Sequence, residues 1–304
     1  EIKEDSYIVD IIKDVEIGGV VLFDFDVPSK SFPRNIINPE QTENLITDLQ
    51  SYSSIPLFIA VDLEGGEINR LYPDYCFSDF LSTEELGEVG NYSATKEVAL
   101  DISQELKELG FNMNFAPVID VNINPENPVI GKLGRSFSSD YQEVSLHGQA
   151  FIEAHNQNSV IAVAKHFPGH GSSLEDSHLG LVDVTETYRE EELIPYKELQ
   201  EKELLNAVMT AHIFNKNIDK DYPATLSSNF IKAILREEMG FKGVVISDDM
   251  QMGAIVDNYE RKEAIIRAIN SGCDVLLFSN NSETGYDKNL PYEIKEIIYQ
   301  AVLN

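Results

Sequence analysis

The 304-residue chain has no tryptophan, only two cysteines and few basic side chains. It carries 23 Lys and Arg residues against 52 Asp and Glu residues, which leaves a formal net charge of −29 at pH 7. Binding of a nucleic-acid backbone depends on clustered Lys and Arg that displace counterions, and anionic membranes attract the same positive charge. The composition therefore excludes a basic nucleic-acid groove and disfavours attachment to an anionic membrane.

Two further absences narrow the class of protein. Cys76 and Cys273 are too few for a disulfide framework, and each lies in or beside an apolar run, where a buried free thiol is the usual state. No apolar stretch reaches the ~20 residues of a membrane-spanning helix, and the acidic start is unlike a signal peptide. We expect a soluble mature protein. Its acidity and the lack of an initiator Met favour a periplasmic or secreted protein, with the cytoplasm as the alternative.

Short β-branched runs alternate with helical patterns along the chain, which is typical of parallel βαβ units. Gly110, Gly240 and Gly272 each follow a helical pattern at the position of a C-cap. No repeat or Pro/Gly/Ser linker interrupts the chain, so one domain over residues 1–304 is expected. The runs predict seven strands: Gly19 to Phe23, Pro56 to Asp62, Phe111 to Asp120, Val160 to His166, Ala207 to His212, Gly243 to Asp248 and Asp274 to Ser279.

Charged or imidazole side chains end most of these runs: Asp62, Asp120, His166, His212 and Asp248. In a closed parallel barrel all C-terminal strand ends meet at one mouth, whereas an open doubly wound sheet uses only those near its switch point. The pattern therefore favours an α/β fold of the (β/α)8 barrel type. Such a barrel needs eight strands, so either one strand lies upstream of Glu1 or the barrel is irregular.

The segment Lys165 to His178 carries the densest set of reactive side chains. His166 and His170 have the spacing of a helical zinc pair, but the intervening Pro and Gly cannot sustain the helix that would align them. A metal site is thus the weaker interpretation. A solvated loop that merely contains histidines is the other alternative, and the three His, one Lys and one Asp that follow a buried strand argue against it.

Asp176 and His178 are two residues apart, a spacing that lets the carboxylate accept a hydrogen bond from one imidazole nitrogen while the other faces outward. Such a histidine can donate and accept a proton near neutral pH. Asp248 ends a strand and, when ionised, can act as a nucleophile at carbon or stabilise a developing cation. The adjacent Asp249 suits the alternative role of a helix N-cap.

Asp62 ends another strand ahead of a Gly pair, and Arg70 follows shortly after. Carboxylate and guanidinium groups at a barrel mouth suit a hydroxyl-rich ligand because they form bidentate hydrogen bonds. A structural salt bridge is the alternative role of Arg70.

Six motifs, which follow one another from near the N-terminus to the last third of the chain, carry a resemblance to a known family. They are DLEGG from Asp62, GRSF from Gly134, KHFPGHG from Lys165, DSH from Asp176, YPATLS from Tyr222 and GFKGVVISDDMQM from Gly240. Together they resemble the family 3 glycoside hydrolases, and within that family the single-domain β-N-acetylglucosaminidases (β-hexosaminidases). The likeness extends from Gly18 to about Phe278.

The resemblance implies a (β/α)8-type barrel, here lacking one strand at the N-terminus. It implies removal of terminal, non-reducing β-linked N-acetylglucosamine, with retention of configuration, from peptidoglycan fragments or chitooligosaccharides. Asp248 would be the nucleophile that forms the glycosyl-enzyme, and His178 with its partner Asp176 would be the general acid and base. No cofactor, metal or obligatory protein partner is implied. The sugar hydroxyls would be held by Asp62, Arg70, Arg135, Lys165 and His166.

The implied dyad lies on a loop bracketed by Gly169, Gly171 and Gly180, so we expect a mobile loop that closes over the sugar and opens to admit water. A histidine base repels an anionic acceptor less than a carboxylate does. This raises the hypothesis that inorganic phosphate competes with water.

Other functions remain open at this point. A β-glucosidase or β-xylosidase would keep the fold and the nucleophile, although DSH favours the acetamido sugar. A catalytically silent carbohydrate-binding barrel belongs to a different class, and the presence of the nucleophile and both dyad members argues against it. A metal-dependent barrel hydrolase is the last alternative, which resistance of the activity to chelators would remove.

Overall fold

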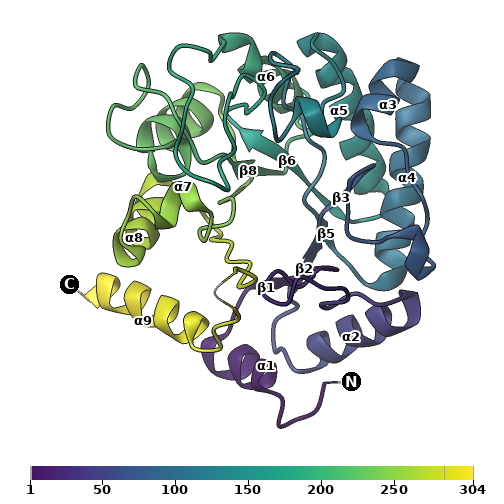
Figure 1. Cartoon of the computed structure of the whole chain (residues 1–304), viewed down its shortest axis with the longest axis vertical. Coiled ribbons are helices and arrows are strands. Elements are labelled where there is room, and N and C mark those ends of the chain that lie inside the picture. Colours follow the sequence, from purple (N-terminus) through teal and green to yellow (C-terminus); the bar gives the residue numbers. More distant parts are fainter. Residues whose placement is uncertain (1, 284, 304) are drawn as a thin grey trace.

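The computed structural model describes residues 2–283 and 285–303. Six strands form one sheet in the order β1-β2-β5-β6-β8-β10, and every neighbouring pair is parallel. The sheet curls, and the helices lie around its outer side (Figure 1). The strands are Gly19–Val21 (β1), Phe58–Val61 (β2), Met113–Asn114 (β5), Ile161–Phe167 (β6), Ala207–Thr210 (β8) and Val244–Ile246 (β10).

Two small ladders follow the C-terminal ends of these strands. Leu63–Gly65 (β3) pairs antiparallel with Ile68–Asn69 (β4) directly after β2. Val182–Asp183 (β7), which follows β6, pairs parallel with Ile213–Phe214 (β9), which follows β8. Both ladders therefore help to build the rim at the end of the sheet where the predicted site residues lie.

Helices connect the strands, and their ends agree with local signals in the sequence. Gly110 and Gly272 end helices with φ values of 93° and 116°, a region that favours glycine, as predicted. No helix in the part that the structure describes is long and apolar enough to cross a membrane. The α-helices are Tyr7–Asp10 (α1), Pro39–Ser51 (α2), Thr83–Val89 (α3), Tyr92–Leu109 (α4), Tyr141–Gln157 (α5), Ile194–Glu201 (α6), Gly253–Val256 (α7), Arg261–Ser271 (α8) and Leu290–Leu303 (α9). Tighter or wider helical turns are Ile11–Val15 (η1), Pro73–Tyr75 (η2), Gly131–Leu133 (η3), Glu190–Leu193 (η4), Ala224–Leu226 (η5) and Asn229–Glu238 (η6).

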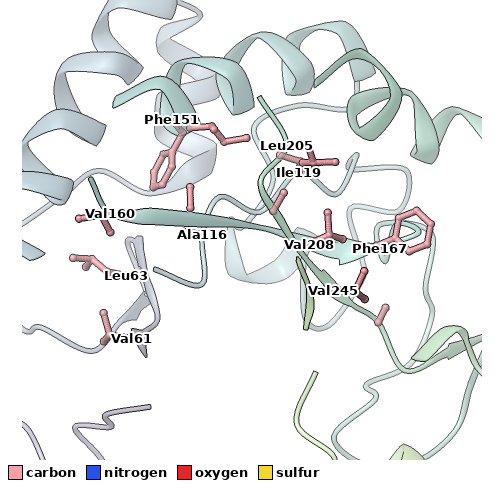
Figure 2. Packing of buried hydrophobic residues seen from close by; sticks show 14 of the residues in the cluster. Val61, Leu63, Ala116, Ile119, Phe151, Val160, Phe167, Leu205, Val208 and Val245 are labelled. Atoms are coloured by element: carbon pink, nitrogen blue, oxygen red, sulfur yellow. The ribbon is translucent and has the colours of Figure 1, made fainter. Parts of the chain in front are cut away.

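The core lies on both faces of the sheet. Between the sheet and the helices, one large cluster includes Phe151 of α5, which lies over Ala116, and the strand residues Val208 and Val245 farther along the sheet (Figure 2). A second cluster fills the concave side with Ala60, Met113, Phe115, Val163, Ala207, Met209 and Ile246. A strand that is buried on both faces has apolar side chains on both faces, so it forms a continuous apolar run that can be recognised in the sequence.

The seventh predicted strand is only partly regular. Its segment, residues 274–279, runs beside β10 through the single bridge Ile246 to Val275. A cavity of about 1030 Å³ separates this segment from β1, and its lining includes Val21, Leu276 and Ile294. The predicted parallel α/β arrangement is confirmed as a curled sheet, but the residues that the structure describes do not close it into a complete (β/α)8 barrel, because no strand bridges the two free edges.

Candidate active site

Polar side chains gather where the parallel strands end, at one mouth of the curled sheet. Parallel strands point the same way, so residues that follow different strands along the chain meet there. The residues are Asp24 after β1, Asp62 after β2, Asp120 after β5, Lys165 and His166 in β6, His212 after β8 and Asp248 after β10.

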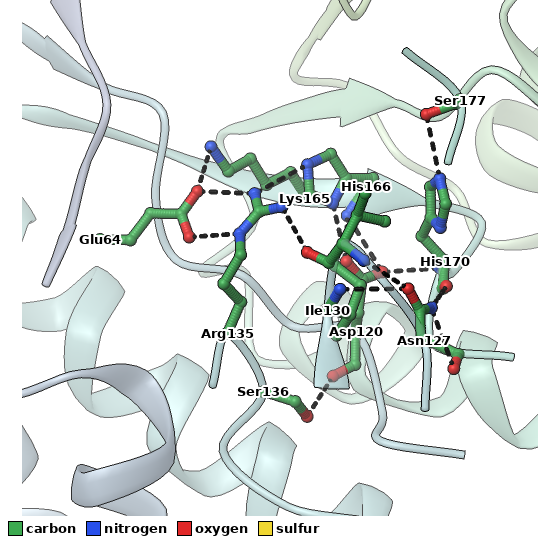
Figure 3. A network of polar contacts seen from close by, with 12 residues as sticks. Glu64, Asp120, Asn127, Ile130, Arg135, Ser136, Lys165, His166, His170 and Ser177 are labelled. Carbon is green, nitrogen blue, oxygen red and sulfur yellow. Dashed lines mark hydrogen bonds and ion pairs between the residues drawn. The ribbon is translucent and has the colours of Figure 1, made fainter. Parts of the chain in front are cut away.

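A buried ionic network forms one side of the site (Figure 3). Lys165 Nζ lies 2.8 Å from Asp62 Oδ1 and 2.7 Å from Glu64 Oε1. Arg135 forms a bidentate pair with Glu64, with Nε to Oε2 and Nη2 to Oε1 both at 2.8 Å. Burial alone would raise the pKa of Glu64, but Arg135 and Lys165 outweigh it and lower this pKa to about 2. Glu64 and the two cations therefore all remain charged at neutral pH.

The members of this network differ in what they can offer a ligand. The side chains of Asp62 and Arg135 keep 19% and 12% of their surface exposed, whereas Lys165 keeps 3%. Two of the predicted hydroxyl-binding residues thus reach the open site. Lys165, predicted as a third, is occupied by its two carboxylate partners.

His166 is fixed between an acid and a guanidinium group. Its Nδ1 lies 2.7 Å from Asp120 Oδ2, and Arg135 Nη2 lies 3.4 Å from its Nε2. Since Arg135 can only donate, its contact is to Nε2 as acceptor, while Nδ1 carries the hydrogen that Asp120 accepts. Asp120 is fully buried, yet His166 and His170 lower its pKa against the effect of burial. The His166 ring is therefore held firmly, with Nε2 at the open side.

His166 and His170 do not act as a pair. Their rings meet edge to face with centroids 5.9 Å apart, and His170 Nε2 lies 3.2 Å from Ser177 Oγ. Across residues 2–283 and 285–303 no three His, Cys, Asp or Glu side chains are arranged to hold a metal ion. The zinc interpretation thus finds no ligand set in the described chain.

Asp248 lies at the end of β10 in a histidine-rich environment. Burial would raise its pKa, but His212, His166 and His178 together lower it. The backbone N–H of Asp249 donates to Asp248 Oδ1 at 2.7 Å. His212 Nε2 donates to the Asp249 carbonyl at 3.0 Å and so anchors the same turn. Asp248 is therefore an ionised carboxylate in a fixed position.

The Asp176–His178 pair forms as its spacing predicts. His178 Nδ1 lies 2.7 Å from Asp176 Oδ1, and 63% of the His178 side chain is exposed. The N–H groups of Gly253 and Ala254 donate to the carbonyls of His178 and Ser177, both at 3.2 Å. These bonds tie the dyad loop to α7, which begins five residues after Asp248, so the two predicted catalytic groups share one side of the mouth.

The three glycines that bracket the dyad loop differ in their surroundings. A Cβ at Gly171 would lie 1.7 Å from the Val121 carbonyl oxygen, and one at Gly169, where φ is +125°, would lie 2.6 Å from Glu192 Cβ. A Cβ at Gly180 would meet no described atom within 4 Å. Close packing therefore requires glycine at positions 169 and 171. Movement of the loop over the sugar stays a prediction.

Asp249 does not cap a helix as proposed. Its Oδ1 accepts the N–H groups of Gln251 at 3.1 Å and Ser279 at 3.0 Å, and α7 begins only at Gly253, without a side-chain cap. Asp249 therefore joins the turn after β10 to the segment that follows it in the curled sheet.

Arg70 lies beside a buried acid that the motif analysis missed. Its Nη1 is 3.7 Å from Asp24 Oδ1, and Asp24 is 1% exposed, with no hydrogen-bond partner for either carboxylate oxygen among the described residues. Burial raises the pKa of Asp24, while Arg70 opposes this effect. Asp24 follows an apolar run just as Asp62 does, so the strand-end pattern could have revealed it.

Glu192 is a second acid that sequence reasoning missed, and it lies beneath the dyad loop. Its side chain is fully buried, and its carboxylate accepts the N–H groups of Ser172 at 3.2 Å and Arg189 at 3.3 Å. Burial raises the pKa of Glu192 to about 7. Nothing local marks this residue, because four glutamates occur within residues 186–192.

Replacing Glu192 with Gln is expected to weaken the pH dependence of stability. The folded state keeps Glu192 protonated up to about pH 7, whereas the unfolded chain loses this proton near its ordinary pKa of 4.5. The wild-type protein should thus lose about 3 kcal/mol as pH rises from 4.5 to 7, and the Gln variant should not. Urea unfolding at pH 5 and pH 8 measures the difference. An equal pH slope in both proteins would contradict it.

Comparison with known proteins identifies the family. Residues 1–301 match the glycosyl hydrolase family 3 N-terminal domain. The chain is 35% identical over 286 residues to beta-hexosaminidase A of Pseudoalteromonas piscicida, covering 88% of this chain and 46% of that protein. It is also 35% identical over 276 residues to beta-hexosaminidase of Shewanella frigidimarina, covering 88% and 76%.

Solved structures agree with the sequence matches. A family 3 beta-N-acetylglucosaminidase from Paenibacillus superposes with a TM-score of 0.88 at 33% identity, covering 98% of this chain and 55% of that one. NagZ from Neisseria gonorrhoeae, in complex with N-trifluoroacetyl-D-glucosamine, gives 0.81 at 29% identity, covering 97% and 81%. The chain thus spans about half the length of the first relative in each comparison.

A parallel α/β sheet with acids and positioned histidines at its mouth, together with these matches, defines the N-terminal domain type of glycosyl hydrolase family 3. The chain belongs to glycoside hydrolase family 3, as its six motifs predict.

Proposed function

We propose that the protein is a retaining exo-glycosidase that removes terminal β-linked N-acetylglucosamine, with Asp248 as nucleophile and His178 as acid and base. The observation that carries the proposal is the Asp176–His178 contact of 2.7 Å on a loop tied to α7, close in the chain to Asp248. The relatives named beta-hexosaminidase and the NagZ complex with an N-acylglucosamine support the choice of an acetamido sugar.

The first step forms a glycosyl-enzyme. The Asp248 carboxylate attacks C1 of the sugar while the bond from C1 to the leaving oxygen breaks, and His178 Nε2 gives its proton to that oxygen. Asp176 accepts a hydrogen bond from the Nδ1–H of the ring, so it stabilises the imidazolium form that donates from Nε2. Asp248 is suited to attack because the surrounding histidines keep it ionised.

The second step releases the sugar. The neutral His178 takes a proton from water as the water oxygen attacks C1, and the bond to Asp248 breaks with the electron pair returning to the carboxylate. Two inversions at C1 retain the configuration. Asp62, Arg135 and His166 offer acceptors and donors for the sugar hydroxyls, with Lys165 holding Asp62 in place and Arg70 at the edge of the pocket.

Hydrolysis of paired aryl glycosides tests this function. We expect the β-N-acetylglucosaminide to be cleaved with a kcat/KM about 100-fold above that of the β-glucoside. Equal or better cleavage of the glucoside or the xyloside would favour the other sugars of the family, and binding without turnover would favour a silent barrel. Product analysis with inorganic phosphate tests the phosphate hypothesis, which the absence of a sugar 1-phosphate would reject.

Replacing Gly253 with Ala is expected to lower kcat about tenfold by displacing the dyad. The added Cβ would lie 2.7 Å from the His178 carbonyl oxygen and 3.2 Å from the Gly180 amide nitrogen, so the loop must move away. Gly180→Ala is the matched control because its Cβ meets nothing within 4 Å. Steady-state kinetics should show the loss in Gly253→Ala alone, and equal kinetics in the two variants would contradict the positioning role.

We also propose that the curled sheet is a (β/α)8-type barrel in which seven strand positions are filled by the described residues. Alternation along a parallel strand turns the amides of Val21 and Leu276 toward the cavity between the two free edges. These amides should exchange hydrogen at least about 100-fold faster than that of Val208 in β8, which is paired on both sides. Equal protection would mean that the two edges pair directly.

A further inference from the structure

Four aromatic side chains form a continuous cluster at the mouth of the site, which we call the aromatic rim. Phe25 and Phe32 come from the loop after β1, and Tyr72 and Tyr75 come from the segment after β4. Ring centroids are 4.8 Å apart for Phe25 and Phe32, 6.1 Å for Phe32 and Tyr72, and 6.5 Å for Tyr72 and Tyr75. Phe32 is 47% exposed. Phe25, Tyr72 and Tyr75 are partly buried, so Phe32 is the ring that the cluster presents most openly. Apolar rings that stay accessible beside an active site are typical of a binding surface.

The aromatic rim adjoins the polar side chains at the mouth of the sheet. Tyr72 lies close to Asp24 and Arg70: burial raises the pKa of the Tyr72 phenol, and the Asp24 charge adds to this effect while Arg70 opposes it. Arg70 in turn donates its backbone N–H to the Asp62 carbonyl at 3.1 Å. A ligand that fills the pocket beside Asp62 therefore comes next to the rim.

The loop that carries Phe25 and Phe32 is held in place before any ligand binds. Asn281 accepts the N–H of Val27 at 3.1 Å and donates to the Phe25 carbonyl at 3.0 Å. Arg34 Nη2 donates to the Asn280 carbonyl at 2.9 Å. The Asn280 N–H donates to Gln251 in the turn after Asp248, so the rim is connected to the turn that carries the proposed nucleophile.

The charge around the aromatic rim selects against an anionic ligand. Residues 24–34 and 62–79, which supply the rim, carry seven acidic and three basic side chains. Two of the acids, Asp62 and Glu64, are paired with Lys165 and Arg135 from elsewhere in the chain, which leaves five acidic side chains against three basic ones. Arg34 is paired with Asp26, and Arg70 faces Asp24. A carboxylate on the ligand would thus meet an excess of negative charge, whereas an uncharged sugar would not.

We propose that the aromatic rim binds a second, uncharged pyranose, so that the preferred substrate is a neutral chitin-type N-acetylglucosamine chain rather than one with an acidic aglycone. The axial C–H groups of a pyranose form an apolar face that packs on aromatic rings, whose faces carry partial negative charge. The inference rests on the proposed function: when the terminal sugar is the one removed, the next sugar lies on the leaving-group side.

Kinetics on substrates with and without a second sugar test the proposal. Phe32→Ala should lower kcat/KM for N,N′,N″-triacetylchitotriose about tenfold and change that for β-N-acetylglucosaminyl fluoride less than about twofold, because the fluoride has no second sugar. Phe32→Tyr keeps a ring and should retain wild-type values. Tyr299→Ala, which removes an exposed ring on α9, should affect neither substrate. Equal losses on both substrates, or no loss in Phe32→Ala, would overturn the proposal.

Two further experiments test the preference for an uncharged second sugar and distinguish a failure of the rim proposal from a failure of the proposed function. The wild-type protein should cleave a disaccharide with a carboxylate-bearing second sugar about tenfold less efficiently than the neutral disaccharide, and an equal or better rate would overturn the neutral preference. Calorimetry measures the affinity of Asp248→Asn for triacetylchitotriose, with and without the second substitution Phe32→Ala. It therefore measures the contribution of the rim to binding in the absence of turnover. Failure of the wild-type protein to cleave the fluoride would refute the proposed function. The calorimetric measurement would still show whether the rim binds a second sugar.

Discussion

Asp248→Asn is expected to lower kcat on an aryl β-N-acetylglucosaminide by at least about 10⁴-fold, the largest effect of any single substitution here. The amide has the size of the carboxylate but cannot form the glycosyl-enzyme. It also removes the charge that His212, His166 and His178 surround. Steady-state kinetics measures the loss, and intact-mass spectrometry with a slow fluorosugar substrate should label the wild-type protein and leave the variant unlabelled.

The neighbouring acid provides the matched control for this substitution. Asp249 accepts two backbone N–H groups through Oδ1, and the oxygen of an Asn side chain can accept the same bonds. Asp249→Asn should therefore keep kcat within about threefold. With Asp248→Gly, added azide should restore turnover and yield the α-glycosyl azide. A greater loss in Asp249→Asn, or a β-configured azide product, would show that the nucleophile has been assigned to the wrong group.

His178→Ala is expected to have the second largest effect, and its size should depend on the leaving group. Chitobiose needs a proton on its leaving oxygen, so its kcat/KM should fall about 10³-fold, whereas a 2,4-dinitrophenyl glycoside needs none in the first step, so its kcat/KM should fall less than about tenfold. Asp176→Asn should fall between the wild-type protein and His178→Ala on chitobiose, because the ring remains but loses its carboxylate partner.

The stability of the His178→Ala variant shows whether His178 has a chemical role or a structural one. Its side chain is 63% exposed, so His178→Ala should leave the urea midpoint unchanged. The pH profile gives a second readout, since the limb that depends on the general acid should disappear in the variant. Equal losses on chitobiose and on the dinitrophenyl glycoside would contradict the acid and base role.

The sequence predicts the strands and helices of this fold better than it predicts whether the sheet closes into a barrel. Strands buried on both faces are apolar throughout, so runs such as Val160 to His166 can be recognised without tertiary information. Gly110 and Gly272 mark helix ends because their positive φ values favour glycine. Whether two free edges meet depends on sheet curvature and on the packing of α9, which no local pattern encodes.

The candidate site divides in the same way. The Asp176–His178 contact is local and follows from a separation of two residues. The Glu64–Arg135 pair joins residues 71 positions apart, and Glu192 reaches the dyad loop across 20, so only the folded chain brings them together. The close packing of Gly169 and Gly171 against Glu192 and Val121 also joins distant parts of the chain, so no local pattern could have predicted it.

The ionic network of Lys165, Glu64, Arg135 and Asp62 limits how this enzyme can diversify. Glu64 is paired with both cations, so losing it alone removes the carboxylate partner of Arg135 in a buried place and costs about 3–5 kcal/mol. A lineage that changes Glu64 alone would lose much of its folding stability before gaining a new sugar preference. Changes in substrate range should therefore arise from substitutions in the loops that carry the aromatic rim. Exposed residues there, such as Phe32, can be exchanged one at a time.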